Sequence, residues 1–270
     1  MTAPGPVKAP PSPAPPQLPP PEPDNDGELR MSILGHLDEL RRRLFRTVIA
    51  LVVTTGIGFL VAGPVLEFLK QPYGTNQFIT LGPTDSVVAY FRVALLVGGI
   101  LAIPVITYQA LMFIVPGLTD RERRYVLYSI PFVTLLFLTG VVFTWALLIP
   151  PAIGFFNSFM PEVFVAQWTA DRYLGFVTAL LFWMGVAFET PLIAFVLSLL
   201  GIVTARMLIK QWRIAIIGAA VAAAIITPTV DPMNMMLVMG PLLGLYLLSI
   251  VLTAVGARFV TPTTEEQLAT

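Results

Sequence analysis

Six long apolar runs constrain the fold of this chain more than any other feature of its sequence. They cover residues 44–63, 87–115, 126–149, 173–200, 214–226 and 235–257. A helix needs roughly 20 apolar residues to cross a bilayer core of about 30 Å, and four or five of the runs are that long. Charged residues make up only 12% of the chain, whereas a soluble protein carries about 25%. We therefore predict an all-α polytopic membrane protein with six transmembrane helices.

The six predicted spans are not uniform. Pro104, Pro131, Pro191 and Pro241 lie inside them and should kink or break the helices, which neighbouring helices in a bundle tolerate. The run at 214–226 would cover only about 20 Å as a helix. This length favours local thinning of the bilayer around the last two spans.

The chain divides into three parts by composition. Residues 1–29 hold 11 of the 25 prolines and no apolar run, which predicts a disordered cytoplasmic tail. Residues 30–258 form the membrane domain, and residues 259–270 form a second, featureless tail. Within the membrane domain, residues 33–44 place apolar side chains at helical spacing. This pattern predicts an amphipathic helix that lies on the membrane surface and leads into the first span.

Basic residues are distributed unevenly between the predicted loops. Thirteen lie before the first span, after the last, or in the two loops on that same side, whereas only Lys70, Arg92 and Arg172 lie on the other side. Because cytoplasmic loops are enriched in Lys and Arg, both termini are predicted to be cytoplasmic. Arg92 and Arg172 should snorkel to the outer interface, where Trp168 and Tyr173 would join an aromatic belt.

The composition also excludes several classes of function. The chain has no cysteine and one histidine, His36, so disulfides and Cys- or His-based metal sites are excluded. The net charge is zero and no basic patch is interleaved with aromatic residues, which argues against nucleic-acid binding. The sequence contains no glycine-rich phosphate loop, no HExxH and no GxSxG with a histidine partner. We expect no cofactor, no metal and no enzymatic activity.

One carboxylate, Glu189, lies inside the fourth apolar run, in the stretch FWMGVAFETPLIAF. Along a helix it would lie about 25 Å from one end of the span and about 16 Å from the other. An ionised carboxylate at that depth is costly, so it should face protein or a water-lined recess, or be protonated; such residues mark functional sites. The alternative is a structural hydrogen bond, for example to backbone groups freed by Pro191.

The other acidic residues of interest have local structural explanations. Thr119 and Glu122 have the spacing of a capping box at the start of the third span, although Glu122 could cap with one oxygen and bind with the other. Glu39 precedes Arg43 by four residues, the spacing of an ordinary helical ion pair. Asp231 is followed by a proline, which is typical of an N-cap at the start of the last span.

Four separate stretches, in this order, resemble a known family. They are HLDELRRRL (36–44), YQALMFIVPGLTDRERR (108–124), GVAFETP (185–191) and ITPTVDP (226–232). Together they resemble TatC, the multispanning subunit of the twin-arginine protein translocase, over roughly residues 32–258. The resemblance implies a receptor driven by the proton-motive force. TatC-like proteins bind the signal peptide of folded cargo, whose paired arginines arrive at the cytoplasmic face.

By this resemblance, the signal peptide would bind at the cytoplasmic end of the bundle. Glu122 matches the family's signal-recognition glutamate, and Glu39 and Arg41 match its N-terminal motif. The residues that shape the same loop are matched by Phe113, Pro116, Gly117 and Leu118. Carboxylates in bidentate geometry are the best partners for a guanidinium group, which agrees with a ligand that carries paired arginines.

The resemblance also assigns contacts with partner proteins. Glu189 matches an intramembrane glutamate in a concave, lipid-facing groove, where it would hydrogen-bond single-span partners of the TatA and TatB types or the inserted signal peptide. Thr227 and Asp231 match a second contact for these partners, and Pro72 matches a proline of the periplasmic cap or simply forms a turn. The implied setting is the cytoplasmic (inner) membrane of a prokaryote, with homo-oligomers in the complex.

Two other classes of function compete with this interpretation. A proton-coupled secondary transporter would use Glu189 as its proton carrier, but such proteins usually show internal repeats and several polar residues near the midplane. Neither feature is found in the sequence. An intramembrane enzyme would need a nucleophile with a neighbouring base, and no such pair is found.

Overall fold

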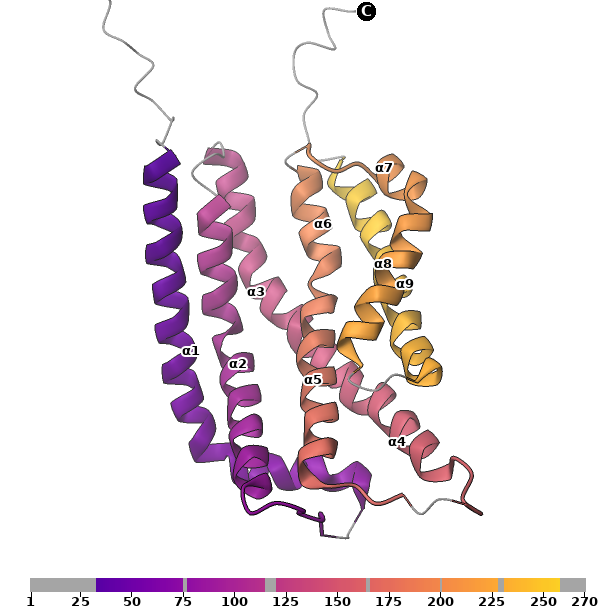
Figure 1. The fold of residues 1–270 in the computed structure, drawn as a ribbon. Helices are drawn as coiled ribbons and strands as arrows, with labels where there is room; N and C mark the ends of the chain where they lie inside the picture. Colours follow the sequence, from indigo (N-terminus) through magenta and orange to yellow (C-terminus); the bar gives the residue numbers. More distant parts are fainter. Residues whose placement is uncertain are drawn as a thin grey trace, which may run out of the picture.

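A computed structural model describes residues 33–74, 77–114, 120–163, 166–199, 201–227 and 231–257. Its long helices run side by side, as Figure 1 shows. The α-helices of the described residues are α1 (Ile33–Lys70), α2 (Asp85–Ile114), α3 (Asp120–Phe143), α4 (Ile149–Ser158), α5 (Ala170–Phe188), α6 (Thr190–Leu199), α7 (Ala205–Lys210), α8 (Trp212–Ile226) and α9 (Pro232–Gly256). A 3₁₀ turn, η2 (Gln71–Tyr73), follows α1, and a π-helical segment, η4 (Thr144–Leu148), joins α3 to α4.

The described helices confirm the all-helical membrane fold. Five helical stretches are long and apolar enough to cross a membrane: Gly35–Tyr73, Asp85–Phe113, Ile130–Ser158, Ala170–Leu199 and Pro232–Gly256. α8, at 15 residues, would cover only about 22 Å, so a sixth crossing stays a prediction. The start of α1 and the end of α9 lie at the same end of the bundle (Figure 1), as expected if both termini are on one side.

The predicted amphipathic helix at residues 33–44 is the first part of a longer helix that continues without a break into the first span, and its position on the membrane surface stays a prediction. α1 is a single helix of 38 residues, about 57 Å long, and therefore longer than a bilayer core is thick. No proline occurs in it before Pro64, so nothing interrupts its hydrogen bonds where the amphipathic stretch passes into the apolar run. The final turns of α1 turn aside and lie level with the lower ends of α2 and α5 (Figure 1).

Three of the four prolines predicted to kink or break the spans leave their helices unbroken. α2, α3 and α9 continue through Pro104, Pro131 and Pro241 as single helices. The break between α5 and α6 falls next to Pro191, as predicted. A second irregularity, η4, precedes the prolines at 150 and 151 of α4. Proline has no N–H to donate to the carbonyl four residues earlier, so the hydrogen-bond ladder shifts there.

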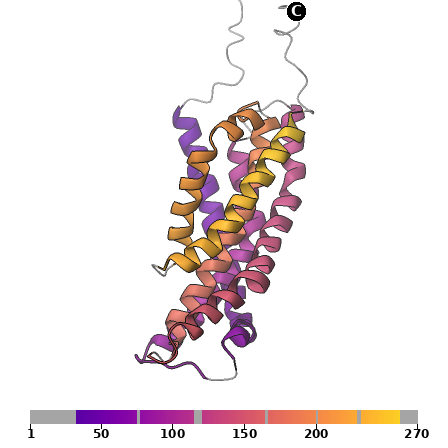
Figure 2. The same ribbon diagram turned by 90° about the vertical axis from the view of Figure 1, so that its right-hand side faces the viewer.

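Close backbone contact joins α1 to α2. Gly58 lies so near the Ala94 carbonyl that a Cβ atom could not fit, and Gly98 lies equally close to Thr55. Small residues at a helix interface allow this close approach. The resulting van der Waals contact holds the helices together, because lipid supplies no hydrophobic driving force for their association. On the other side of the bundle, α9 packs against α6 and α8, and Figure 2 shows α8 and α9 side by side in front of the other helices.

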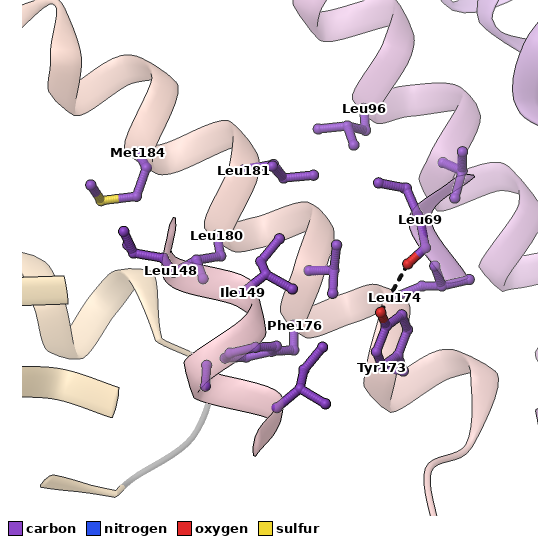
Figure 3. Close-up of a cluster of buried hydrophobic side chains, with 14 of the residues drawn as sticks. Leu69, Leu96, Leu148, Ile149, Tyr173, Leu174, Phe176, Leu180, Leu181 and Met184 are labelled. Carbon is purple, nitrogen blue, oxygen red and sulfur yellow. Dashed lines mark hydrogen bonds between the residues drawn. The ribbon is translucent and has the colours of Figure 1, made fainter. Parts of the chain in front are cut away.

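The main apolar core lies where α5 meets α2, α4 and the end of α1. Figure 3 shows Leu148 and Ile149 packed against Phe176 and Leu180, with Leu96 on the far side. The Tyr173 ring is fully buried here, and its hydroxyl donates a 2.8 Å hydrogen bond to the Leu69 carbonyl. Tyr173 is therefore not part of an aromatic belt facing lipid, contrary to the sequence-based expectation.

Candidate functional site

Glu189 occupies the break between α5 and α6. Its N–H donates to the Val186 carbonyl at 3.1 Å, and its own carbonyl accepts from Leu192 and Ile193 at 3.1 and 3.0 Å. The next residue but one is Pro191, which cannot donate to a carbonyl in the preceding turn. The sequence Glu-Thr-Pro thus ends one helix and begins the next, and it fixes the backbone from which the carboxylate projects.

Glu189 lies far from both ends of its helical stretch, and its side chain is half-buried. It is about 28 Å along the helix from the start of α5 and about 15 Å from the end of α6, so neither helix end brings it to water. Its Oε1 atom is buried and has no hydrogen-bond partner in the described part of the chain. Burial of an unsatisfied polar atom costs about 1–3 kcal/mol. A group that waits for a ligand is expected to be in this unsatisfied state.

Near the start of α1, Glu39 belongs to a cluster of side chains that joins α1 to α2. Arg43 donates to Glu39 Oε1 through Nε at 2.8 Å and through Nη2, and its Nη1 donates to Gln109 Oε1 at 3.4 Å. The predicted helical ion pair is therefore confirmed, although its link to α2 was not anticipated. Glu39 Oε2 is also buried without a hydrogen-bond partner in the described residues.

The same cluster brings in one of the predicted loop residues. Phe113, one turn beyond Gln109 on α2, stacks on His36, with 4.3 Å between the ring centroids. Arg41 is exposed on α1 and forms no ion pair with a described side chain. Pro116, Gly117 and Leu118 lie outside the described residues, and so does the side chain of Glu122, whose backbone belongs to α3.

The predicted partner contact at the junction of α8 and α9 consists of Asp231 and Thr227, whose side chains have different hydrogen bonds. Asp231 is the N-cap of α9, as predicted, and accepts from the Asn234 N–H at 2.7 Å and from Asn234 Nδ2 at 3.1 Å. Thr227 is buried, and its hydroxyl donates to the Ala223 carbonyl at 2.7 Å. Pro72 is half-buried in the 3₁₀ turn η2, which agrees with the simple turn.

An ion pair that the sequence did not predict joins α2 to α5. Arg92 Nη2 lies 3.1 Å from Asp171 Oδ1, and Arg92 Nη1 donates to the Asp171 carbonyl at 2.9 Å. Arg92 therefore does not simply snorkel to the interface. The pair borders a partly open hollow of about 780 Å³ between α1, α2 and α5. Glu189 does not line this hollow, so the groove expected around Glu189 stays a prediction.

A bundle of long apolar helices, with an unpartnered carboxylate inside it and an acid–guanidinium cluster at one end, defines a multi-pass membrane protein with candidate binding sites. Residues 35–241 match the sequence model of the family described as "Sec-independent protein translocase protein (TatC)". The chain belongs to the TatC family.

Individual relatives support this assignment. A Sec-independent protein translocase protein TatC from Synechocystis sp. is 39% identical over 81% of this chain and 86% of its own length. One from Deinococcus radiodurans is 37% identical over 94% of this chain and 98% of its own length. A crystal structure named as the twin arginine translocase receptor TatC superposes with a TM-score of 0.74 at 35% identity, covering 83% of this chain and all of that one.

These comparisons confirm the resemblance read from the four sequence motifs. They do not favour the proton-coupled transporter, because the relatives are named as protein translocase proteins. The family is a component of a protein translocase and is not a family of catalytic enzymes.

Proposed function

We propose that this protein is the signal-peptide receptor and core subunit of a twin-arginine translocase. It exports folded proteins across the cytoplasmic membrane of a prokaryote and uses the proton-motive force. It is not an enzyme. The solved relative is named as a translocase receptor, and the two relatives described above come from bacteria.

One observation carries the proposal. Glu39 and Glu189 each keep one buried carboxylate oxygen without a hydrogen-bond partner in the described residues. A buried acceptor in this state gains free energy from any donor that reaches it. Guanidinium groups of a signal peptide are such donors for Glu39, and polar groups of a membrane-inserted partner are such donors for Glu189.

The cytoplasmic end is the proposed site for the paired arginines. Glu39 and Glu122 supply the carboxylates, Arg41 follows Glu39 by two residues on α1, and Phe113 stacks on His36, one turn before Glu39. The remaining members of this site are the loop residues Pro116, Gly117 and Leu118. Arg43 holds Glu39 Oε1, which leaves Oε2 for the incoming guanidinium.

Single-span partners of the TatA and TatB types are proposed to dock at Glu189 within the membrane. A second contact is proposed at Thr227 and Asp231, between α8 and α9. Because the Thr227 hydroxyl is already bonded within its helix, this residue would act by shaping the helix end. Pro72 would belong to a rigid cap on the outer side, and several copies of the chain would assemble in one complex.

Crosslinking to a signal peptide tests the receptor function. A photoreactive peptide with an Arg-Arg pair is compared with its Lys-Lys counterpart, on purified full-length protein and on the variants Glu39→Gln and Glu122→Gln. We expect each variant to lose capture of the Arg-Arg peptide by about tenfold or more. Glu67→Gln is the matched control, because Glu67 is exposed and outside the site. Equal capture of both peptides by every variant would refute the receptor function.

Export of a folded reporter tests the role of Glu189. Glu189→Gln should abolish export and copurification of single-span partners, while the protein accumulates in the membrane and still captures the Arg-Arg peptide. An uncoupler should stop export by the unmodified protein. Normal export by Glu189→Gln would show that this carboxylate has no docking role.

A further inference from the structure

The hollow between α1, α2 and α5 has a charged end and an apolar end. Arg92, Asp171 and Arg172 line one end, with Trp168 beside them, and the walls are otherwise mostly apolar. Arg92 and Arg172 are two of only three basic residues on the predicted outer side. Their presence in one hollow is an exception to the charge distribution of the chain, and neither the translocase function nor the family assignment uses it.

The direction of this polarity follows from the helices. Asp171 and Arg172 lie in the first turn of α5, and Arg92 leans toward the start of α2 because helical side chains point toward the N-terminus. Both helices start at the same end of the bundle (Figure 1), which is the predicted outer end. Gly99 on α2 is about 10 Å deeper than Arg92, and Phe182 on α5 is about 15 Å deeper than Arg172. The hollow is thus charged at the interface and apolar toward the membrane centre.

The charges at the outer end are held in place and leave a positive surplus. Arg92 is bound to Asp171 by two contacts, and Gly175 provides the space for the Arg92 guanidinium, because a Cβ atom there would overlap Nη1. Arg172 is exposed and forms no ion pair with any side chain in the described ranges. The two guanidinium groups and one carboxylate leave one net positive charge.

We propose that this hollow binds an anionic phospholipid of the outer leaflet. The phosphate would lie against Arg172 and the free edge of Arg92, and one acyl chain would run inward past Leu95 and Ala179 to Phe182. A spanning helix fits less well. A helix is about 10–12 Å across, so 780 Å³ would hold roughly two turns of it, whereas a spanning helix needs about 20 residues.

Native mass spectrometry of the full-length protein, with phosphatidylglycerol or phosphatidylcholine of the same chain length, tests the site. We expect the unmodified protein to retain phosphatidylglycerol in preference to phosphatidylcholine. Arg172→Gln should weaken phosphatidylglycerol binding about tenfold, whereas Arg206→Gln, which removes an exposed arginine on α7, should not.

The apolar end is tested separately. Ala179→Leu should fill the hollow and lower retention of both lipids, whereas Ala224→Leu, at an exposed position on α8, should not. Since Ala179→Leu could disturb folding, a second experiment leaves the lining of the hollow unchanged. In a variant that keeps Trp168 as its only tryptophan, brominated phosphatidylglycerol should quench the Trp168 fluorescence more than brominated phosphatidylcholine does.

Three results would overturn the proposal: equal retention of the two lipids by the unmodified protein, equal loss in Arg172→Gln and Arg206→Gln, or equal quenching of Trp168 by both brominated lipids. If Ala179→Leu instead prevents capture of a single-span partner and leaves lipid binding unchanged, the hollow is a helix-docking site. These results are independent of signal-peptide capture, so the translocase function can stand or fall separately.

Discussion

At the scale of single residues, Tyr173 shows how this fold satisfies the end of a helix. The last carbonyls of a helix have no intrahelical donor, and inside a membrane protein they must find one within the protein. Leu69 lies at the end of α1, and its carbonyl accepts from the fully buried Tyr173 hydroxyl at 2.8 Å. The side chain that was expected to face the membrane interface is therefore a link between α5 and α1.

We expect Tyr173→Phe to lower the free energy of unfolding by about 1 kcal/mol, because it leaves the Leu69 carbonyl without its donor while preserving the ring. Unfolding in detergent micelles measures this. Tyr108→Phe is the control, because Tyr108 is 41% exposed and should change stability little. Equal stability of Tyr173→Phe and the unmodified protein would show that the hydrogen bond contributes nothing.

At the scale of secondary structure, α1 and α2 depend on glycine for their contact. An added Cβ at Gly58 would overlap the Ala94 carbonyl, a backbone atom that cannot move alone, whereas Gly56 meets nothing within 4 Å. The two glycines lie in the same helix, two residues apart, and differ only in what they face. They form a natural matched pair for measuring how much the close approach of these helices contributes.

We expect Gly58→Ala to destabilise the protein by about 1–3 kcal/mol, the usual cost of overpacking. Gly56→Ala should stabilise it by roughly 0.5–1 kcal/mol, because alanine is the better helix former. Thermal unfolding of both variants in the same detergent gives the comparison. If both substitutions shift the midpoint in the same direction, the close packing of α1 on α2 is not required.

At the scale of the whole molecule, the absence of cysteine from the sequence allows a direct test of orientation. Thr80 precedes α2 at the predicted outer end, Gln211 separates α7 from α8 at the predicted cytoplasmic end, and both are exposed. In intact cells, a membrane-impermeant thiol reagent should label Thr80→Cys but not Gln211→Cys. After lysis it should label both. The reverse pattern would invert the topology deduced from charge.

The membrane class, the apolar segments, the Asp231 cap and the Glu39–Arg43 pair were predictable from the sequence. The membrane class and the apolar segments follow from the low content of charged residues and from the long apolar runs. The cap and the ion pair each join residues within about one helical turn, where spacing along the chain fixes the contact. The break at Pro191 was predictable for the same reason, because proline acts on its own turn.

Contacts between distant segments could not be predicted from one sequence. The Arg92–Asp171 pair joins residues 79 positions apart, the Tyr173–Leu69 bond 104 positions and the Arg43–Gln109 bond 66 positions. Periodicity describes one helix at a time and does not indicate which face of another helix it will meet. The sequence alone determined that this chain enters a membrane as helices. Tertiary packing decided which charges are paired and which carboxylate oxygens remain without a partner.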